Sequence, residues 1–314
     1  MVSLSVVVPV YNGALSLREL TRQLADELAQ LADSYELIFV EDDGQDDSWQ
    51  VITELAAEYA WVRGYKHMRN YGQHNALLQG IRQARYEIIV TMDDDLQHPP
   101  HEIRRLLAKL LEGYDVVYGT PQQEQHGLLR DLASQVTKLA LQSAMGVEVA
   151  RSVSAFRIFR TQLRDAFASY QSPYVSIDVL LTWGTTRFAA IPVPHAPRQY
   201  GQSNYTLRKL VTHALNMMTG FSIVPLQIAT LVGFALTLFG LLVLVYVIGR
   251  LLFEASVPGF PFLASIIAIF SGAQLFALGI IGEYLARMHI RIMGQPSSVV
   301  REAVEGAQTE PDQP

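Results

Sequence analysis

Two different patterns of apolar residues divide the chain. Up to about residue 200, short apolar runs such as SLSVVVPV, YELIFV, YEIIV and DVVYGT alternate with longer segments that have apolar residues at helical spacing, such as LRELTRQLADELAQLA. The short runs are typical of strands buried on both faces, and the longer segments are typical of amphipathic helices. Their alternation predicts an α/β domain over residues 1–205, with a mostly parallel sheet flanked by helices.

After residue 220 the apolar residues form continuous runs. Residues 227–249 (QIATLVGFALTLFGLLVLVYVIG) and 260–282 (FPFLASIIAIFSGAQLFALGIIG) contain no charged side chain. As helices, both are long enough to cross the roughly 30 Å hydrocarbon core of a bilayer. A hairpin buried in a soluble core is the alternative. Two such runs with a short connection favour a transmembrane hairpin over residues 227–284.

Basic residues near the hairpin indicate its orientation. They lie mostly outside the two runs: Arg208, Lys209, Arg287, Arg291 and Arg301, against Arg250 in the connection. By the positive-inside rule, both ends of the hairpin face the cytoplasm. We expect a juxtamembrane amphipathic helix at 206–226 and a cytoplasmic C-terminal segment at 285–314 with a disordered end.

Composition narrows the class of protein. The 314 residues are 50% hydrophobic and only 17% charged, which is low for a soluble enzyme, where about a quarter are charged. A net charge of −6 argues against a nucleic-acid partner, because no basic surplus is present to neutralise phosphates. The absence of cysteine excludes disulfides, thiolate zinc sites and cysteine nucleophiles. The N-terminus lacks the pattern of a signal peptide, so we expect the first domain in the cytoplasm.

An acidic stretch follows one of the predicted strands. In TMDDDLQHPP (91–100), three adjacent carboxylates repel one another unless a cation or strong donors neutralise them. Two residues apart on a strand, Asp93 and Asp95 would project to the same side and suit Mg²⁺ or Mn²⁺, with Gln97 as a further oxygen ligand. The alternative is a solvated acidic turn.

Three other polar stretches follow strands or precede a helix. VVVPVYNG places Tyr11 and Asn12 after the first strand, and VEDDGQDDS places Asp42, Asp43 and Asp47 after the second. Such carboxylates can accept hydrogen bonds from a ribose or a base edge, or they can belong to a solvated turn. In HMRNYGQHNALLQG (67–80), the residues Arg69, Asn70 and Gly72 precede a helix whose first amides could receive phosphate oxygens. His74 and His98 lie near these stretches and could also touch phosphates.

Together these stretches resemble a known family. SVVVPVYNG, DDGQDDS, RNYGQHNALLQG and DDDLQHPPHEI, followed by RQYGQSNYTLRKL (198–210) and GIIGEYLARMHIR (279–291), are similar to family-two glycosyltransferases with a GT-A fold. The similarity is strongest to the branch that loads sugars onto polyprenyl phosphate, such as dolichol-phosphate mannose synthase, bactoprenol glucosyltransferases and undecaprenyl-phosphate formamido-arabinose transferase. The motifs occur in the family's order over about residues 3–300.

The resemblance implies roles for individual residues. It implies that Asp93, Asp95 and Gln97 hold Mg²⁺ or Mn²⁺ on the donor diphosphate, with Asp95 also counted as catalytic. It implies a donor-nucleotide site formed by Pro9, Tyr11, Asn12, Asp42, Asp43, Arg69, Asn70, Gly72, Gln73 and Asp94.

The chain departs from the family on the acceptor side. SAFRIF has Ala155 where many relatives carry an aspartate proposed as acid–base. A phosphate monoester has a second pKa near 6 and needs positioning more than deprotonation. Arg157 and Arg198, with Ser203, are therefore candidates to hold that phosphate, although either arginine could be an ordinary salt-bridge residue. Asp178 is a speculative replacement base or, alternatively, a helix cap.

Other departures also concern phosphate contacts. Asn204 stands where some relatives have lysine, and PQQEQ (121–125) lacks the arginines that often follow the corresponding strand. The segment 127–145 is amphipathic with few charges and either lies on the bilayer surface or packs on the sheet.

Taken with these patterns, the resemblance implies a membrane-anchored, metal-dependent, inverting glycosyltransferase of a bacterial inner membrane, with both termini cytoplasmic. Its donor would be a nucleotide-sugar, expected to be a UDP-sugar, and its acceptor polyprenyl (undecaprenyl) phosphate. Two alternatives stay open: transfer to a glycan hydroxyl, which needs a general base, and a non-catalytic nucleotide-binding membrane scaffold. A homo-oligomer formed through the hairpin is a further open expectation.

Overall fold

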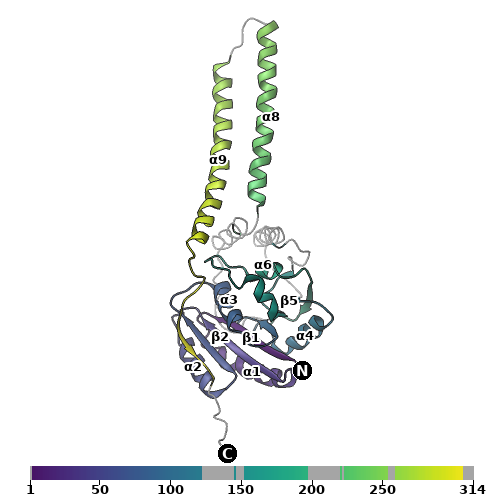
Figure 1. Ribbon diagram of the computed structural model, residues 1–314, viewed down its shortest axis with the longest axis vertical. Coiled ribbons are helices and arrows are strands. Elements are labelled where there is room, and N and C mark those ends of the chain that lie inside the picture. The colour runs from purple at the N-terminus through teal and green to yellow at the C-terminus, as the bar shows by residue number, and fades with distance from the viewer. Residues whose placement is uncertain are drawn as a thin grey trace, which may run out of the picture.

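A mixed α/β domain carries two long helices that project from it (Figure 1). The computed structural model describes residues 2–121, 145, 152–196, 220, 223–253 and 259–306. The strands are β1 (Ser3–Val10), β2 (Ser34–Glu41), β3 (Val62–His67), β4 (Ile88–Thr91), β5 (Val116–Pro121), β6 (Arg157–Arg160), β7 (Phe188–Val193) and β8 (Val300–Val304). The helices are α1 (Leu17–Leu31), α2 (Ser48–Glu58), α3 (Gln73–Gln83), α4 (Ile103–Leu111), α6 (Ile177–Thr182), α8 (Val224–Phe253) and α9 (Phe260–Ile292), with 3₁₀ turns η1 (Pro100–Glu102) and η3 (Thr161–Phe167).

The sheet has the strand order β7-β5-β6-β4-β1-β2-β3-β8. Its centre is parallel, because β1 pairs with β2 and β4, and β2 pairs with β3. Strand β7 is also parallel to β5, whereas β6 and β8 run antiparallel to their neighbours. The expected parallel sheet is thus confirmed at its centre, and its outer parts are mixed.

Two apolar layers cover the two faces of the sheet, and successive side chains of β1 point alternately into each layer. Val6 and Val8 pack with α1, α2 and α4 on one face, while Val7 packs with α3 and α6 on the other. All three valines are fully buried. Because the central strands are parallel, the carboxyl ends of β1, β2, β3 and β4 share one edge, where ligands bind in such folds.

The two projecting helices α8 and α9 are the predicted apolar hairpin. Segments Val224–Tyr246 and Ile269–Ile292 are long and apolar enough to cross a membrane. Their large side chains point outward: Leu231, Phe234 and Leu275 are each more than two-thirds exposed. Helix α9 continues to Ile292, beyond the predicted hairpin limit at 284.

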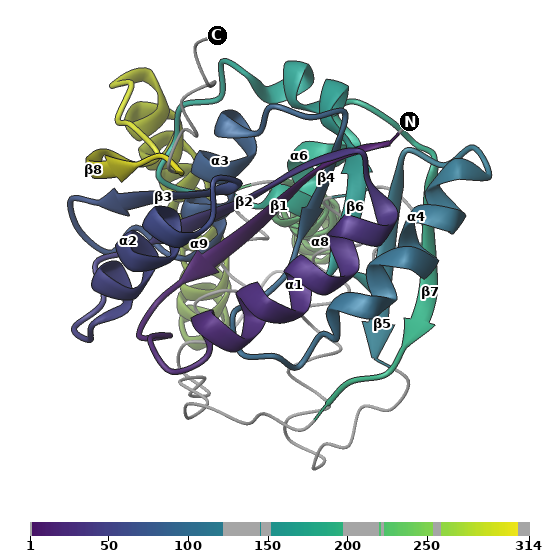
Figure 2. The same ribbon diagram turned by 90° about the horizontal axis from the view of Figure 1, so that it is seen from below.

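Strand β8 was not predicted. After α9 the chain returns to the domain, and Val300–Val304 pairs antiparallel with β3 at the sheet edge opposite β7 (Figure 2). Arg63 bonds both Glu36 and Glu305, which fixes the far end of this strand. The described part of the segment 285–314 therefore continues α9 and then completes the sheet.

Candidate active site

The loops after β1, β2 and β4 meet at one edge of the sheet and share an unusual backbone conformation. Asn12, Asp43 and Leu96 have φ values of 57°, 56° and 60°, the non-glycine residues with positive φ in the described part of the chain. For leucine in particular this conformation is rare. Strained residues of this kind persist where the surroundings fix them, and they gather at ligand sites.

Side chains and glycines lock these loops together. Asn12 Oδ1 accepts a hydrogen bond from the Gln45 amide at 2.7 Å, which joins the β1 and β2 loops. A Cβ on Gly44 would lie 2.8 Å from that oxygen, so glycine is needed there. A Cβ on Gly13 would lie 2.0 Å from Asp94 Oδ2, which places the β4 loop directly against the β1 loop.

Asp42 shapes the loop before α3. Its carboxylate is 3% exposed. One oxygen accepts from the Tyr71 amide at 2.9 Å and contacts His67 Nδ1 at 2.7 Å; the other accepts from the Gly72 amide at 2.6 Å. Asp42 therefore organises the loop from within instead of facing a nucleoside as expected. The Tyr71 and Gly72 amides likewise donate to Asp42, not toward a phosphate.

The acidic stretch is linked to α3. Gln73 Nε2 donates to Asp93 Oδ1 at 2.6 Å, and the Gln97 amide donates to Asp95 Oδ1 at 3.1 Å. Strand β4 ends at Thr91, so the predicted strand alternation does not apply: Asp95 is buried while Asp93 is partly exposed.

The donor set fits a hard divalent cation only in part. Among the described residues, no group of three or more His, Asp or Glu side chains is arranged to hold a metal. Asp93 and Asp95 can supply two carboxylates, and a cation such as Mg²⁺ commonly takes its other ligands from waters and substrate phosphates. The carboxylate chemistry of the loop therefore fits a metal that binds together with a diphosphate.

The remaining predicted donor residues lie at the same edge. Pro9 is buried in β1, whereas Tyr11 is 46% exposed just beyond it. Arg69 and Asn70 are exposed, and the Arg69 guanidinium lies 4.7 Å from the centre of the Tyr71 ring. These exposed groups, unlike Asp42, are open to a ligand.

On the acceptor side, Arg157 and Asp178 form a buried ion pair with each other. They are 2% and 4% exposed, and the Tyr118 hydroxyl donates to the same Asp178 oxygen at 3.0 Å. Burial raises the pKa of Tyr118 well above its usual value, so it stays a donor. The expected phosphate contact by Arg157 and the spare-base role of Asp178 both conflict with this geometry. Asp178 is not the helix cap either, because Ser176 precedes α6.

Other acceptor-side predictions fall outside the described residues. These are Arg198, Ser203, Asn204, the amphipathic segment 127–144 and nearly all of 206–222.

The two histidines noted in the sequence are structural in this arrangement. His98 is buried, stacks on Phe156 with ring centres 5.3 Å apart, and lies 5.3 Å from His195. Burial, and then the neighbouring His195, lowers the pKa of His98 to about 4, so it is neutral at pH 7. His74 Nδ1 accepts from the Ile177 amide at 3.4 Å and joins α3 to α6.

Arg301 is a residue of this edge that sequence reasoning counted only as a topology signal. From β8, its guanidinium donates to the Met68 carbonyl at 2.7 Å and lies 3.6 Å from Asp43. No local motif marks it, because it reaches the edge only through the pairing of β8 with β3.

Comparison with known proteins identifies the family. A profile described as "Glycosyl transferase family 2" matches residues 5–167, just over half of the chain. The chain belongs to glycosyl transferase family 2. Within that family, an undecaprenyl-phosphate 4-deoxy-4-formamido-L-arabinose transferase of Pseudomonas fluorescens is 33% identical over 98% of this chain and 91% of its own. The enzyme of that name from Proteus mirabilis is 34% identical over 96% of this chain and 93% of its own.

Solved structures agree on the fold. Glucosyl-3-phosphoglycerate synthase from Mycobacterium tuberculosis, in complex with Mn²⁺, uridine-diphosphate-glucose and phosphoglyceric acid, superimposes with a TM-score of 0.52. The match has 18% identity over 69% of this chain and 78% of that one. The predicted GT-A fold, the two apolar C-terminal helices and the glycosyltransferase class are thus confirmed.

Proposed function

We propose that the protein transfers a sugar from a nucleotide-sugar to the phosphate of a polyprenyl lipid such as undecaprenyl phosphate. The expected donor is a UDP-sugar. The observation that carries this proposal is how much of the chain is similar to relatives whose names include undecaprenyl phosphate. It covers 96–98% of the chain, and so includes the apolar hairpin as well as the sheet domain.

The reaction would be a single inverting displacement. An oxygen of the lipid phosphate attacks the anomeric carbon, the bond from that carbon to the diphosphate oxygen breaks, and the nucleoside diphosphate leaves. The attacking phosphate monoester is mostly dianionic at neutral pH, because its second pKa is near 6. Ala155 in place of an acid–base aspartate is compatible with such a nucleophile, as is the engagement of Asp178 with Arg157.

Different residues at the carboxyl edge of the sheet would bind the nucleotide and the metal. Tyr11, Asn12, Asp43 and Arg69 would contact the nucleotide, and Asp93 and Asp95 would hold Mg²⁺ or Mn²⁺ with the diphosphate. A bound divalent cation supplies stabilisation of the charge that develops on the leaving diphosphate. The Gln73–Asp93 hydrogen bond would keep the acidic loop against the start of α3.

We place the protein in a bacterial inner membrane with the domain and both termini in the cytoplasm. Strand β8 supports this topology, because a segment after the hairpin pairs with a strand before it. This pairing favours a topology in which both ends of the hairpin lie on one side of the membrane. The basic residues near those ends favour the cytoplasmic side.

The test is transfer of label from nucleotide-sugars into lipid. Purified protein in detergent would receive undecaprenyl phosphate, Mg²⁺ or Mn²⁺, and a panel of radiolabelled nucleotide-sugars. We expect one donor to label the organic phase, and Asp95→Asn to lower that rate about 100-fold or more, as loss of a charge-stabilising group at an active site does. Asp26→Asn, which removes an exposed carboxylate of α1, is the matched control. Metal-dependent nucleotide binding with no labelled lipid from any donor would contradict the proposal.

A further inference from the structure

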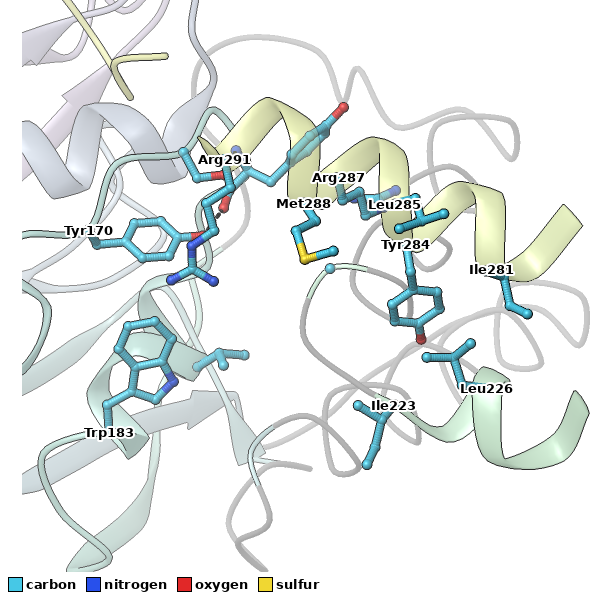
Figure 3. Close-up of a pocket in the computed structure, with 14 residues that line it drawn as sticks. Tyr170, Trp183, Ile223, Leu226, Ile281, Tyr284, Leu285, Arg287, Met288 and Arg291 are labelled. Carbon is cyan, nitrogen blue, oxygen red and sulfur yellow. Dashed lines mark hydrogen bonds between the residues drawn. The ribbon is translucent and has the colours of Figure 1, made fainter. Parts of the chain in front are cut away.

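The end of α9 reaches the domain beside a cavity that lies beneath the hairpin (Figure 3). The cavity has a volume of about 530 Å³ and is lined by side chains of both parts, among them Tyr170 and Arg291. The Arg291 guanidinium lies over the Tyr170 ring at 5.2 Å. Helix α9 ends at Ile292, and only residues 293–296 separate it from the segment 297–304, which contacts the domain along its length. The chain therefore passes almost directly from the hairpin to this segment.

Two serines at the start of this segment are held by side chains of α3. Ser297 is 1% exposed, and its hydroxyl accepts a hydrogen bond from Arg82 Nη1 at 3.1 Å. The Ser298 hydroxyl donates to Gln79 Oε1 at 3.3 Å. Arg82 also donates to the Tyr170 carbonyl at 2.6 Å. One arginine of α3 therefore contacts both the wall of the cavity and the chain that follows the hairpin.

The next residues of the segment hold Met68 on both sides. The Met68 amide donates to the Val299 carbonyl at 2.9 Å, and the Met68 carbonyl accepts from Arg301 Nη2 at 2.7 Å. The Arg301 guanidinium also lies 3.6 Å from Asp43. Met68 directly precedes Arg69, and both Arg69 and Asp43 are among the proposed nucleotide contacts. The segment therefore fixes the loops after β2 and β3 from outside both loops.

Strand β8, which forms most of the segment, has the features of an element that opens locally. It lies at the edge of the sheet, and three of its five residues are exposed. Its register against β3 shifts between Lys66 and His67, directly before Met68. Edge elements with exposed backbone open more readily than core strands, and irregular pairing of this kind is frequent beside active sites. Opening of β8 would release the contacts of Met68 and Asp43 together.

We infer that the segment 297–304 is a positioning element of the donor site, and that its docking and the binding of the donor nucleotide favour each other. The inference rests on the proposed function in one respect, because it takes the nucleotide to bind at the loops after β1, β2 and β3. Arg301 acts through Met68 and Asp43 and does not contact the nucleotide. Coupling between two sites is reciprocal, so the factor by which docking strengthens nucleotide binding is the factor by which the nucleotide strengthens docking.

Hydrogen exchange measures this coupling in the unmodified protein. Full-length protein in detergent would be followed by mass spectrometry with and without saturating UDP and Mn²⁺. We expect exchange of the β8 amides to slow about tenfold, within the range of roughly 5- to 150-fold that is typical of coupled sites. The first residues of β7, which forms the opposite edge of the same sheet, are the matched control and should exchange at an unchanged rate. Unchanged exchange in β8, or equal slowing in β7, would overturn the inference.

A triple variant tests the same coupling from the side of the segment. Ser297→Ala with Ser298→Ala and Arg301→Gln removes the side-chain hydrogen bonds that hold the segment and keeps its backbone. Its dissociation constant for UDP, measured by isothermal titration, should rise about tenfold. Arg22→Gln on exposed α1 is the control and should bind UDP as the parent protein does. A triple variant that is less stable but binds UDP with unchanged affinity would make the segment structural only and would overturn the inference.

The outcomes separate this inference from the proposed function. UDP that binds without slowing exchange in β8 would contradict the inference and leave transfer to a lipid phosphate intact. Coupling between UDP and β8 in a protein that labels no lipid would contradict the proposed acceptor alone. A protein that does not bind UDP with Mn²⁺ would contradict both.

Discussion

The sheet domain and the helical hairpin are both rich in apolar side chains, yet they place them in opposite ways. Phe39 of β2 is fully buried among residues of the domain, whereas Phe234 of α8 is 69% exposed. In the domain, apolar side chains gain stability by leaving water and by close packing. Exposed side chains of the hairpin can gain it only from surroundings that are themselves apolar. Phenylalanine therefore stabilises the domain and the hairpin in two different environments, a packed protein core and apolar surroundings outside the protein.

The largest effect should come from truncating matched phenylalanines in the two regions. Phe39→Ala removes a ring from a packed core and should lower the free energy of unfolding of the domain by about 3–5 kcal/mol. Phe234→Ala should change it by about 0.5 kcal/mol or less, the scale of one apolar residue in a membrane helix. Denaturant titration in mild detergent measures both. Equal losses would show that the hairpin packs like a core and would break the contrast.

Arginines offer a second comparison, because one is buried in the domain and another lines the cavity beneath the hairpin. Arg157→Met leaves Asp178 buried without its cation and should cost about 3–5 kcal/mol in the free energy of unfolding. Adding Asp178→Asn should recover most of that loss, since the amide can still accept from Tyr118. Arg291→Met should be nearly neutral for stability. An Arg157→Met protein that is stable but has a raised KM for the lipid acceptor would restore the role expected from the sequence.

Histidines sharpen the comparison through pH. The pKa of His98 is lowered to about 4, mainly by burial, so the folded domain resists its protonation. Its contribution is complete above the ordinary histidine pKa near 6.5 and is lost as pH falls toward 4, on the order of 3 kcal/mol in all. His98→Gln should flatten the decline in stability between pH 7 and pH 4.5. A decline in stability between pH 7 and pH 4.5 that is as steep in His98→Gln as in the parent protein would contradict this.

The smallest predicted effect concerns the strand that links the two regions. Arg301→Gln removes a cation 3.6 Å from Asp43 and a hydrogen bond to the Met68 carbonyl at a partly exposed position. Exposed pairs of this kind contribute little, so the dissociation constant for UDP should rise about threefold. Isothermal titration of UDP, with Arg22→Gln as control, measures this. A loss of 50-fold or more would mean that Arg301 contacts the nucleotide directly.

Much of the architecture could be predicted because it depends on local periodicity. A short stretch of sequence is enough to predict that β1, with its valines, is a buried strand. The same holds for the uncharged runs of α8 and α9, which predict long apolar helices. The loops that meet at the carboxyl edge of the sheet could be located from ordered motifs, and their role in donor binding stays a prediction. The inward turn of Asp42 and the Arg157–Asp178 pair were not, because each depends on partners far along the chain. Strand β8 gave no signal, since three of its five residues are exposed and its pairing partner lies in the first quarter of the chain.

The pairing of β8 with β3 also determines when the sheet can be completed during synthesis of the chain. A ribosome makes β3 early, but the strand that covers its edge emerges only after both apolar helices have been synthesised. During that interval the nascent domain presents an unpaired strand edge, the kind of surface on which chains aggregate. Synthesis of the two apolar helices and closure of the sheet by β8 are therefore successive steps. A fragment that ends before the hairpin would lack β8 and would therefore keep the edge of β3 unpaired.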